Sequence, residues 1–246
     1  MPTCGSATDP WNLHRVIPAK GGIVEAPRAS TALVFAGGEP VDAAIAARLP
    51  GPEDREVIVV AADSGVEHAL ALGRRVDFVV GDLDSAAPAA VDAAVAAGAE
   101  VRRYPAEKDQ SDLELALDAV RCQGATHVIV VGGYGGRLDH FLANALLLAS
   151  PAFADLSIEA LVGDARITVI HECARLTGTP GDVCSLLAVG GAARRVRTSG
   201  LRYQLQGEDL LPGSTRGLSN ELAEPVATVS LQYGTLLAVQ PNIGGT

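Results

Sequence analysis

Apolar runs, separated by stretches of helical spacing, constrain the fold of the first half of this chain more than any other feature. Strands that are apolar throughout are typical of a parallel sheet whose two faces are covered by helices. We therefore expect a doubly wound α/β domain. The expected strands are Thr31–Ala36, Glu56–Ala62, Asp77–Val80, Glu100–Tyr104 and His127–Val131. The expected helices are Val41–Leu49, Ser64–Leu72, Pro88–Ala97, Asp112–Cys122 and Leu138–Ala149.

The second half has a different sequence pattern, with short β-like runs and little helical spacing after about Pro151. Gly, Pro and Thr separate these runs, which favours an antiparallel all-β sandwich or barrel. The runs are Ser157–Val162, Ile167–His171, Val183–Val189, Arg194–Thr198, Ala227–Leu231 and Thr235–Val239. The first two could instead extend the sheet of the first half. We place the boundary near Thr168–Cys173, which gives a loose arm at 1–30, an α/β domain at 31–170 and a β-rich domain at 171–246.

The charge and composition exclude several classes of partner. A formal net charge of −10 gives no electrostatic footprint for nucleic acid or an anionic membrane, so neither is expected as a partner. The longest apolar helix candidate, at 141–149, is too short to span a bilayer, and residues 1–30 lack the apolar core of a secretory signal. The four cysteines are scattered without zinc-ligand spacing, so we expect free thiols in a cytoplasmic protein.

Asp82 and Asp84 lie two residues apart in the segment Gly81–Ser85, directly after an expected strand. Two carboxylates at the end of a buried strand repel each other unless a cation lies between them, and Mg²⁺ prefers such oxygen ligands. Ligands also usually bind at the carboxyl ends of parallel strands. The segment therefore indicates a Mg²⁺-phosphate site. A solvated turn is the alternative, because Gly, Asp and Ser are common in turns.

Asp63 stands at a second strand-to-helix turn, in the segment Ala62–Gly65. Ser64 is placed to cap the following helix, and Gly65 is small enough to allow close approach of a ligand. A helix cap alone would also explain this segment.

A third turn, Lys108–Glu114, carries Asp109 and Asp112 beside a predicted capping box of Ser111 and Glu114. Acidic side chains in a first helical turn complement the helix dipole, so capping accounts for this segment on its own. Capping does not account for the number of aspartates at successive turns of one sheet edge. Such a cluster implies bound cations.

A fourth turn, Gly132–Gly136, is followed by Arg137, Asp139 and His140 at the entrance of an apolar helix. Backbone N–H groups and a guanidinium would cradle phosphate there. The spacing fits neither a dinucleotide-binding G-x-G-x-x-G nor a Walker A motif. His140 is more often a supporting residue than a catalyst in such a place.

The segment Thr215–Glu221 of the second half offers hydroxyl, amide and carboxylate groups in one polar loop. Such groups can recognise a small heterocycle by hydrogen bonds. The same composition is common in exposed hairpins, so the loop is a weak signal by itself.

Taken in order, these five motifs resemble those of the thiamine pyrophosphokinase (thiamine diphosphokinase) family, over about Ala32 to Pro241. The resemblance implies an N-terminal three-layer α/β/α catalytic domain with a mainly parallel sheet, and a C-terminal β domain that helps to hold thiamine. It implies a homodimer with active sites between subunits. It also implies the reaction, in which Mg-ATP and thiamine give thiamine diphosphate and AMP.

The resemblance also assigns roles to individual residues. The main Mg²⁺ and catalytic carboxylates are expected to be Asp82, Asp84 and Asp112. The expected ATP-binding residues are Asp63, Lys108, Ser111, Arg137 and Asp139. Ser219 and Asn220 match the thiamine-contacting loop. We expect Asp112 or Asp84 to accept the hydroxyl proton, although an aspartate of ordinary pKa is a weak base.

Two other functions share part of this pattern. A different diphosphokinase, such as a pterin type, or a nucleotide-sugar transferase would share Asp82 and Asp84, but the Ser219 loop argues against both. A catalytically silent nucleotide or thiamine sensor would keep the pocket, but it would not need all the acidic positions.

Overall fold

The computed structural model describes residues 31–40, 46–52, 54 and 56–243. The expected arm at 1–30 and the first part of the expected helix Val41–Leu49 lie outside these residues. No helix within the described ranges is long and apolar enough to cross a membrane.

A parallel sheet forms the first half, as the apolar runs predict. Its strands lie in the order β4-β3-β2-β1-β5-β6, and each neighbouring pair is parallel. The strands are β1 (Thr31–Phe35), β2 (Ile58–Ala62), β3 (Phe78–Gly81), β4 (Glu100–Arg103), β5 (His127–Val131) and β6 (Ser157–Val162). Because β1 lies in the middle of this order, both of its faces are buried.

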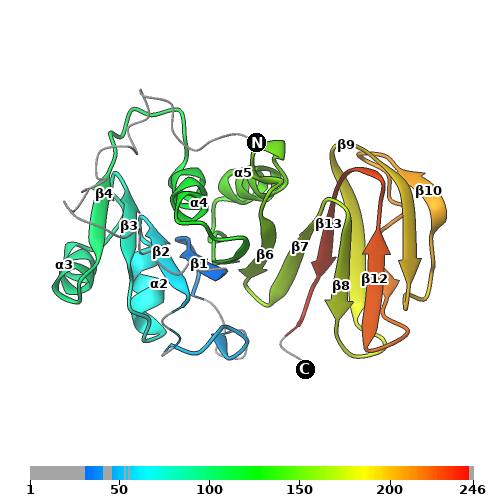
Figure 1. The fold of residues 1–246 in the computed structure, drawn as a ribbon, viewed down its shortest axis with the longest axis horizontal. Helices are drawn as coiled ribbons and strands as arrows, with labels where there is room; N and C mark the ends of the chain where they lie inside the picture. The colour runs from blue at the N-terminus through cyan, green and yellow to red at the C-terminus, as the bar shows by residue number, and fades with distance from the viewer. Residues whose placement is uncertain (1–30, 41–45, 53, 55, 244–246) are drawn as a thin grey trace, which may run out of the picture.

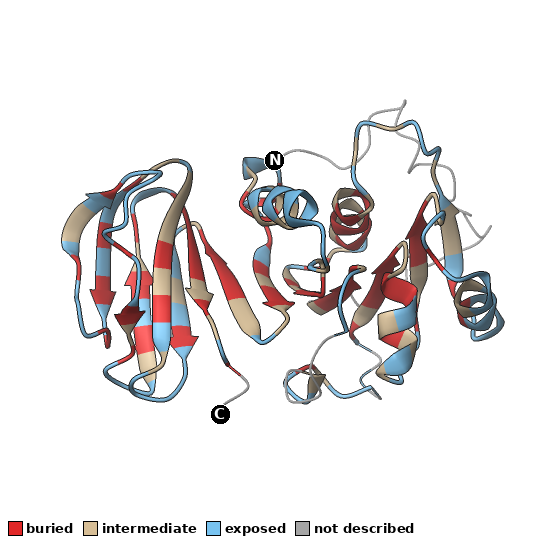
Figure 2. Cartoon of the chain, turned by 180° about the vertical axis from the view of Figure 1, so that it is seen from behind, coloured by how far each residue is buried: buried red, intermediate tan, exposed pale blue. Residues whose placement is uncertain are grey.

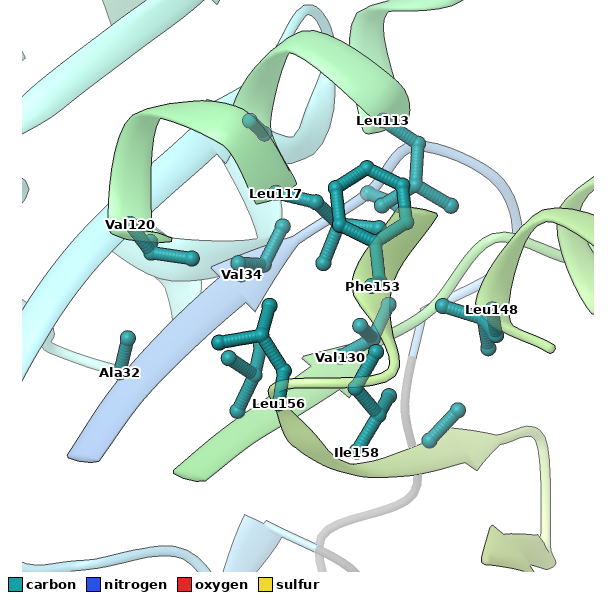
Figure 3. Packing of buried hydrophobic residues seen from close by; sticks show 14 of the residues in the cluster. Ala32, Val34, Leu113, Leu117, Val120, Val130, Leu148, Phe153, Leu156 and Ile158 are labelled. Atoms are coloured by element: carbon teal, nitrogen blue, oxygen red, sulfur yellow. The ribbon is translucent and has the colours of Figure 1, made fainter. Parts of the chain in front are cut away.

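Helices and apolar cores lie on both faces of this sheet (Figure 1). On one face, the alternate residues Ala32 and Val34 pack with Leu113, Leu117 and Val120 of α4 (Figure 3). The next residues of β1 point to the opposite face and pack with α2 and α3, because side chains alternate along a strand. The helices are α2 (Gly65–Ala71), α3 (Pro88–Ala96), α4 (Asp112–Cys122), α5 (Leu138–Leu148) and the short 3₁₀ helix η2 (Pro151–Phe153).

The second half continues the same sheet with antiparallel strands, so the whole is a mixed sheet. Strand β7 pairs with β6, β13 with β7, and β9 with β13, all antiparallel. The strands are β7 (Ala165–Ile170), β8 (Cys173–Thr177), β9 (Val183–Ser199), β10 (Gln206–Leu210), β11 (Asn220–Glu221), β12 (Val226–Ser230) and β13 (Tyr233–Gln240). Buried and exposed residues alternate along many of these strands (Figure 2). The first two β-like runs of this half therefore extend the first sheet, which was one of the two expected outcomes.

Two details of the second half differ from the sequence prediction. Val183–Val189 and Arg194–Thr198 were expected as separate strands, but both belong to β9, which continues through an irregularity opposite Gly234 and a left-handed Arg195 with φ 55°. Strands β8, β10 and β11 were not expected. The sequence of β10, Gln206–Leu210, is largely polar, so no apolar run marks it.

Candidate active site

A cavity of about 520 Å³ lies at the carboxyl ends of the parallel strands β1, β2, β3 and β5. The segments that follow these four strands and the beginnings of α4 and α5 form its wall. Its lining includes the predicted residues Asp63, Asp82, Asp84, Ser111, Asp112 and Arg137. It also includes Ala36, Gly37, Gly38, Ser64, Ser85, Gly133, Gly135, His140 and Asn144. The sheet edge at which the sequence predicts the site therefore contains a cavity.

Three carboxylates converge in this cavity. Asp63, Asp82 and Asp84 each offer an oxygen, and these oxygens all lie within 4.8 Å of one another. Adjacent strands bring them together, because the backbone N–H of Asp63 donates to the carbonyl of Val80 at 2.9 Å. Leu83, between the other two aspartates, has a left-handed φ of 64°, which is unfavourable by roughly 1 kcal/mol for such a residue. The turn thus keeps a strained residue between two carboxylates.

The residues of this acidic cluster fit a divalent cation. Asp63 Oδ1 is buried and has no hydrogen-bond partner in the structure. Leaving a buried carboxylate oxygen unpaired is costly unless a cation or a proton satisfies it. Three carboxylates with converging oxygens form the hard donor set that Mg²⁺ prefers. Asp63 therefore belongs to the carboxylate cluster, whereas the sequence analysis expects it among the ATP-binding residues.

Burial raises the pKa of Asp63 above its ordinary value. The charges of Asp112 and Asp84 raise this pKa further, while hydrogen bonds from the Ser64 backbone and from Ser85 lower it. Between the ordinary value and the raised one, the folded chain binds more protons than the unfolded chain. Stability therefore falls as the pH rises through this window, and at neutral pH the ionised Asp63 destabilises the metal-free fold.

We predict that Asp63→Asn raises the melting temperature of the metal-free protein at neutral pH, because it removes this buried charge. Asn also tolerates the left-handed φ of 47° at this position. Mg²⁺ should raise the melting temperature of the wild type and much less that of the variant. Thermal melts at pH 4 to 8, with and without Mg²⁺, measure both effects. Asp92→Asn on α3 is the exposed control, and a variant less stable than the wild type without metal contradicts the prediction.

Lys108 lies between two carboxylates of the cavity. Its Nζ is 3.1 Å from Asp112 Oδ1 and 3.4 Å from Asp82 Oδ2. The backbone N–H of Asp84 and the Lys108 ammonium lower the pKa of Asp82. Asp112 thus pairs with an ammonium in the structure and stands beside the three-carboxylate cluster, so its role as a metal ligand stays a prediction.

The helix caps differ between the two turns for which they were expected. Ser111 caps α4, since its Oγ accepts from the backbone N–H of Glu114 at 3.2 Å. Ser64 makes no such bond at the start of α2, so that expectation was wrong. A Cβ on Gly37 would lie 2.2 Å from Ser64 Oγ, so this hydroxyl stands close to the glycine loop after β1.

Two glycine segments line the cavity side by side. Gly133 N–H donates to Gly37 O at 2.8 Å, and Glu39 N–H donates to Tyr134 O at 2.6 Å. The side-chain amide of Asn144 donates to Gly133 O at 3.1 Å and ties this loop to α5. Gly133 itself is left-handed, with φ 82°. Sequence reasoning found the glycines after β5 but missed Gly37 and Gly38, although the same signal, glycines directly after an apolar strand, was present.

Arg137 and Asp139 form an exposed ion pair at the start of α5. The Arg137 Nη2 lies 2.6 Å from Asp139 Oδ2, and its Nε donates to Oδ1 at 2.9 Å. The guanidinium lowers the pKa of Asp139. Arg137 lines the cavity, while Asp139 occupies its fork. The guanidinium would have to exchange Asp139 for phosphate to bind a nucleotide.

The predicted thiamine residues lie away from the cavity within one chain. Asn220 is 5% exposed, and its side chain bonds the backbone of Tyr203 at 3.0 and 2.7 Å. Ser219 is exposed, has φ 52°, and its N–H donates to Ser185 Oγ at 3.1 Å. Ser185 lies on β9, seven strand steps from β3, or roughly 34 Å along the sheet at about 4.8 Å per step. One chain therefore does not bring Ser219 to Asp82.

Comparison with known proteins gives the same two-part arrangement. A model described as the catalytic domain of thiamin pyrophosphokinase matches residues 53–160. A model described as the vitamin B1 binding domain of thiamin pyrophosphokinase matches residues 166–236. The thiamine pyrophosphokinase of Bacillus subtilis is 27% identical over 202 residues, which cover 78% of this chain and 91% of that protein.

Solved structures of such proteins superpose on this chain. The thiamin pyrophosphokinase structure from Geobacillus thermodenitrificans has a TM-score of 0.71 and 28% identity, covering 86% of this chain and 97% of that one. The Bacillus subtilis structure has a TM-score of 0.74 and 24% identity, covering 86% and 99%, and supports the fold. Since both models of one family match in order and together span most of the sequence, the chain belongs to the thiamine pyrophosphokinase family.

Proposed function

We propose that this chain transfers a diphosphate group from Mg-ATP to the hydroxyl of thiamine, giving thiamine diphosphate and AMP. The observation that carries this proposal is the cavity in which Asp63, Asp82 and Asp84 converge beside Lys108 and two glycine segments. Carboxylates cannot neutralise phosphate themselves, so a bound Mg²⁺ would supply the bridging positive charge. Asp63, Asp82 and Asp84 would hold it, with Asp112 beside them.

The chain's own groups suit the remaining steps. The thiamine hydroxyl oxygen forms a bond to the β-phosphorus of ATP, the bond from this phosphorus to the α-phosphate oxygen breaks, and AMP leaves. The hydroxyl proton passes to a carboxylate, for which Asp112 and Asp84 remain the candidates. Lys108 provides a cation for phosphate oxygens, and the N–H groups of the glycine segments orient them. Arg137 would bind the nucleotide after releasing Asp139.

We assign the domains as expected from the sequence, with a three-layer α/β/α catalytic domain at 31–170 and a β sandwich or barrel at 171–246. The helices on both faces of the parallel sheet support the first description. The separate apolar core of the second half, which includes Leu186, Val196 and Val229, supports the second. A cytoplasmic location remains part of the proposal.

We further propose a homodimer in which each active site takes its acidic cavity from one chain and its thiamine-binding loop from the other. The support is the separation of the cavity and the loop within one chain. Ser219 bonds to Ser185 on β9, and β9 lies seven strand steps from β3, the strand that precedes Asp82. A site that needs both groups is incomplete within a single copy.

The direct test is incubation with ATP, Mg²⁺ and thiamine, followed by separation of AMP from ADP. AMP and thiamine diphosphate in equal amounts are expected. ADP as product, or no product, rejects the proposal. Binding of thiamine without turnover would instead favour a silent sensor, and turnover of a pterin alcohol in place of thiamine would favour the other diphosphokinase.

Mixed dimers test the composite site. We predict that Asp82→Asn and Ser219→Arg are each nearly inactive alone, the second because a cation at this exposed position repels the cationic thiazolium of thiamine. In a random mixture one site of each mixed dimer carries neither lesion, so activity should return to about a quarter of the wild-type value. The measurement is AMP release after co-refolding the two variants in equal amounts. Activity that stays at the mean of the two variants contradicts a shared site.

A further inference from the structure

A second cavity, of about 180 Å³, lies at the amino ends of β2 and β3, at the opposite edge of the parallel sheet from the active-site cavity. Its charged lining residues are Asp54, Arg74, Arg75 and Asp77. None of these four lines the active-site cavity, and none has a part in the proposed reaction. Their charges therefore need an explanation of their own.

Arg74 is the buried charge of this second cavity. The residue is 8% exposed, and its Nη1 donates to the carbonyl of Pro50. Its Nε is buried and has no hydrogen-bond partner among the described residues. Burial lowers the pKa of Arg74, and no carboxylate in the described part of the chain counters this shift. A guanidinium nevertheless stays charged in a protein, and a buried charge is costly unless an opposite charge meets it. Arg74 thus lacks an anion within the described residues.

The two aspartates of the second cavity do not fill this need. Asp77 Oδ1 lies 2.5 Å from Arg75 Nη2, and Asp77 Oδ2 accepts from the N–H of Val59 at 2.9 Å. Asp54 Oδ1 accepts from the N–H of Glu56 at 3.1 Å, while no described residue bonds Asp54 Oδ2. The cavity therefore offers an unpaired guanidinium edge and one carboxylate oxygen that is open to a donor.

This pair of groups selects among small anions. The N–H groups along one edge of a guanidinium form a fork that binds two oxygens of a phosphate or a carboxylate. An ionised carboxylate such as that of Asp54 can only accept a hydrogen bond, so it favours an anion that carries an O–H group. Hydrogen phosphate has such a group. Sulfate and acetate are fully ionised at neutral pH, and the Asp54 charge would repel them.

We propose that the second cavity is a binding site for a phosphate group that keeps one proton, with Arg74 holding two of its oxygens and Asp54 accepting its O–H. Inorganic phosphate and a small phosphate monoester share this chemistry. Bound phosphate would join Arg74, which follows α2, to Asp54, which precedes β2. The site does not depend on the proposed reaction, because its residues lie at the other edge of the sheet.

The test is calorimetric titration and thermal melting of the full chain without Mg²⁺ or ATP, at constant ionic strength. Inorganic phosphate should bind the wild type and raise its melting temperature, while sulfate and acetate should bind at least about 10-fold more weakly. Arg74→Met should weaken phosphate binding at least about 10-fold, and an apolar side chain in place of a buried charge is usually tolerated by a fold. Arg175→Met, at an exposed arginine of β8 outside both cavities, is the matched control and should bind phosphate like the wild type.

Two further variants place the phosphate and test its proton. Asp54→Asn keeps an oxygen for the Glu56 N–H and should let sulfate bind about as well as phosphate; this change of preference can be measured even if Arg74→Met does not fold. Arg137→Met alters the active-site cavity and should leave phosphate binding unchanged.

The source of the phosphate is read by titrating glycerol phosphate beside inorganic phosphate. Equal affinity assigns the site to a phosphate carried on a larger molecule, and rejection of the ester assigns it to inorganic phosphate. Three results overturn the inference: a wild type that binds neither, binding that a folded Arg74→Met leaves unchanged, and binding that Arg137→Met abolishes, since the phosphate would then occupy the active site.

Discussion

Replacing Asp82 by Asn is expected to lower AMP release by roughly 10³-fold or more at saturating Mg²⁺, because one carboxylate of the three-oxygen cluster becomes a neutral amide. The same change removes the ion pair with Lys108 Nζ, which is 3.4 Å away. Lys108 would then pair with Asp112 alone, and its ammonium would be less well aligned for phosphate. Raising the Mg²⁺ concentration should restore little, because the lost ligand also positions the phosphates.

The measurement is kcat for AMP release, together with Mg²⁺ binding by calorimetry. Asp92→Asn on α3 is the control, since it removes an exposed carboxylate that does not line the cavity and should change neither quantity. The thermal melt of Asp82→Asn without metal should stay close to that of the wild type. A folded variant with near-normal turnover would mean that Asp82 is not part of the catalytic cluster.

Patterns that depend on burial were predictable from the sequence. In Thr31–Phe35 and His127–Val131 every residue after the first is apolar because both faces of the strands are covered, so the strands and their parallel pairing followed. The Ser111 cap of α4 also followed, since it depends on residues only three apart in sequence. Local chemistry and burial therefore made most of the strands and helices of the first half predictable.

Contacts that depend on which strands are neighbours were harder to predict. Asp63 joins Asp82 and Asp84 because β2 and β3 are adjacent, which no local pattern states. The sequence analysis also expects Asp112 as a metal ligand, which stays a prediction, and in the structure Asp112 pairs with Lys108 beside the cluster. The polar strand β10 is held by its pairing with β9 and not by its own apolar residues. The distance of Ser219 from the cavity is likewise a property of the sheet order, which its loop sequence does not indicate.

Gly65 shows a related limit of sequence reasoning. Its place after Asp63 and Ser64 suggested room for a ligand. The structure instead brings backbone to this glycine, because a Cβ there would lie 2.0 Å from the carbonyl oxygen of Phe35 and 2.5 Å from its carbonyl carbon. The missing side chain lets α2 begin directly against the end of β1. Close packing of helix on strand, and not ligand access, is the reason for this glycine.

Gly65→Ala is therefore expected to destabilise the fold, although helix propensity alone predicts the reverse. Alanine in place of glycine favours a helix by about 1 kcal/mol, while forcing a Cβ against fixed backbone costs roughly 3 kcal/mol. The net loss should be about 2 kcal/mol in the free energy of unfolding, seen as a lower urea midpoint. Activity should fall as well, because a shift of α2 moves Asp63. Gly191→Ala, where a new Cβ meets nothing within 4 Å, is the matched control, and equal midpoints for the two variants would show that the approach of α2 to β1 is looser than these distances require.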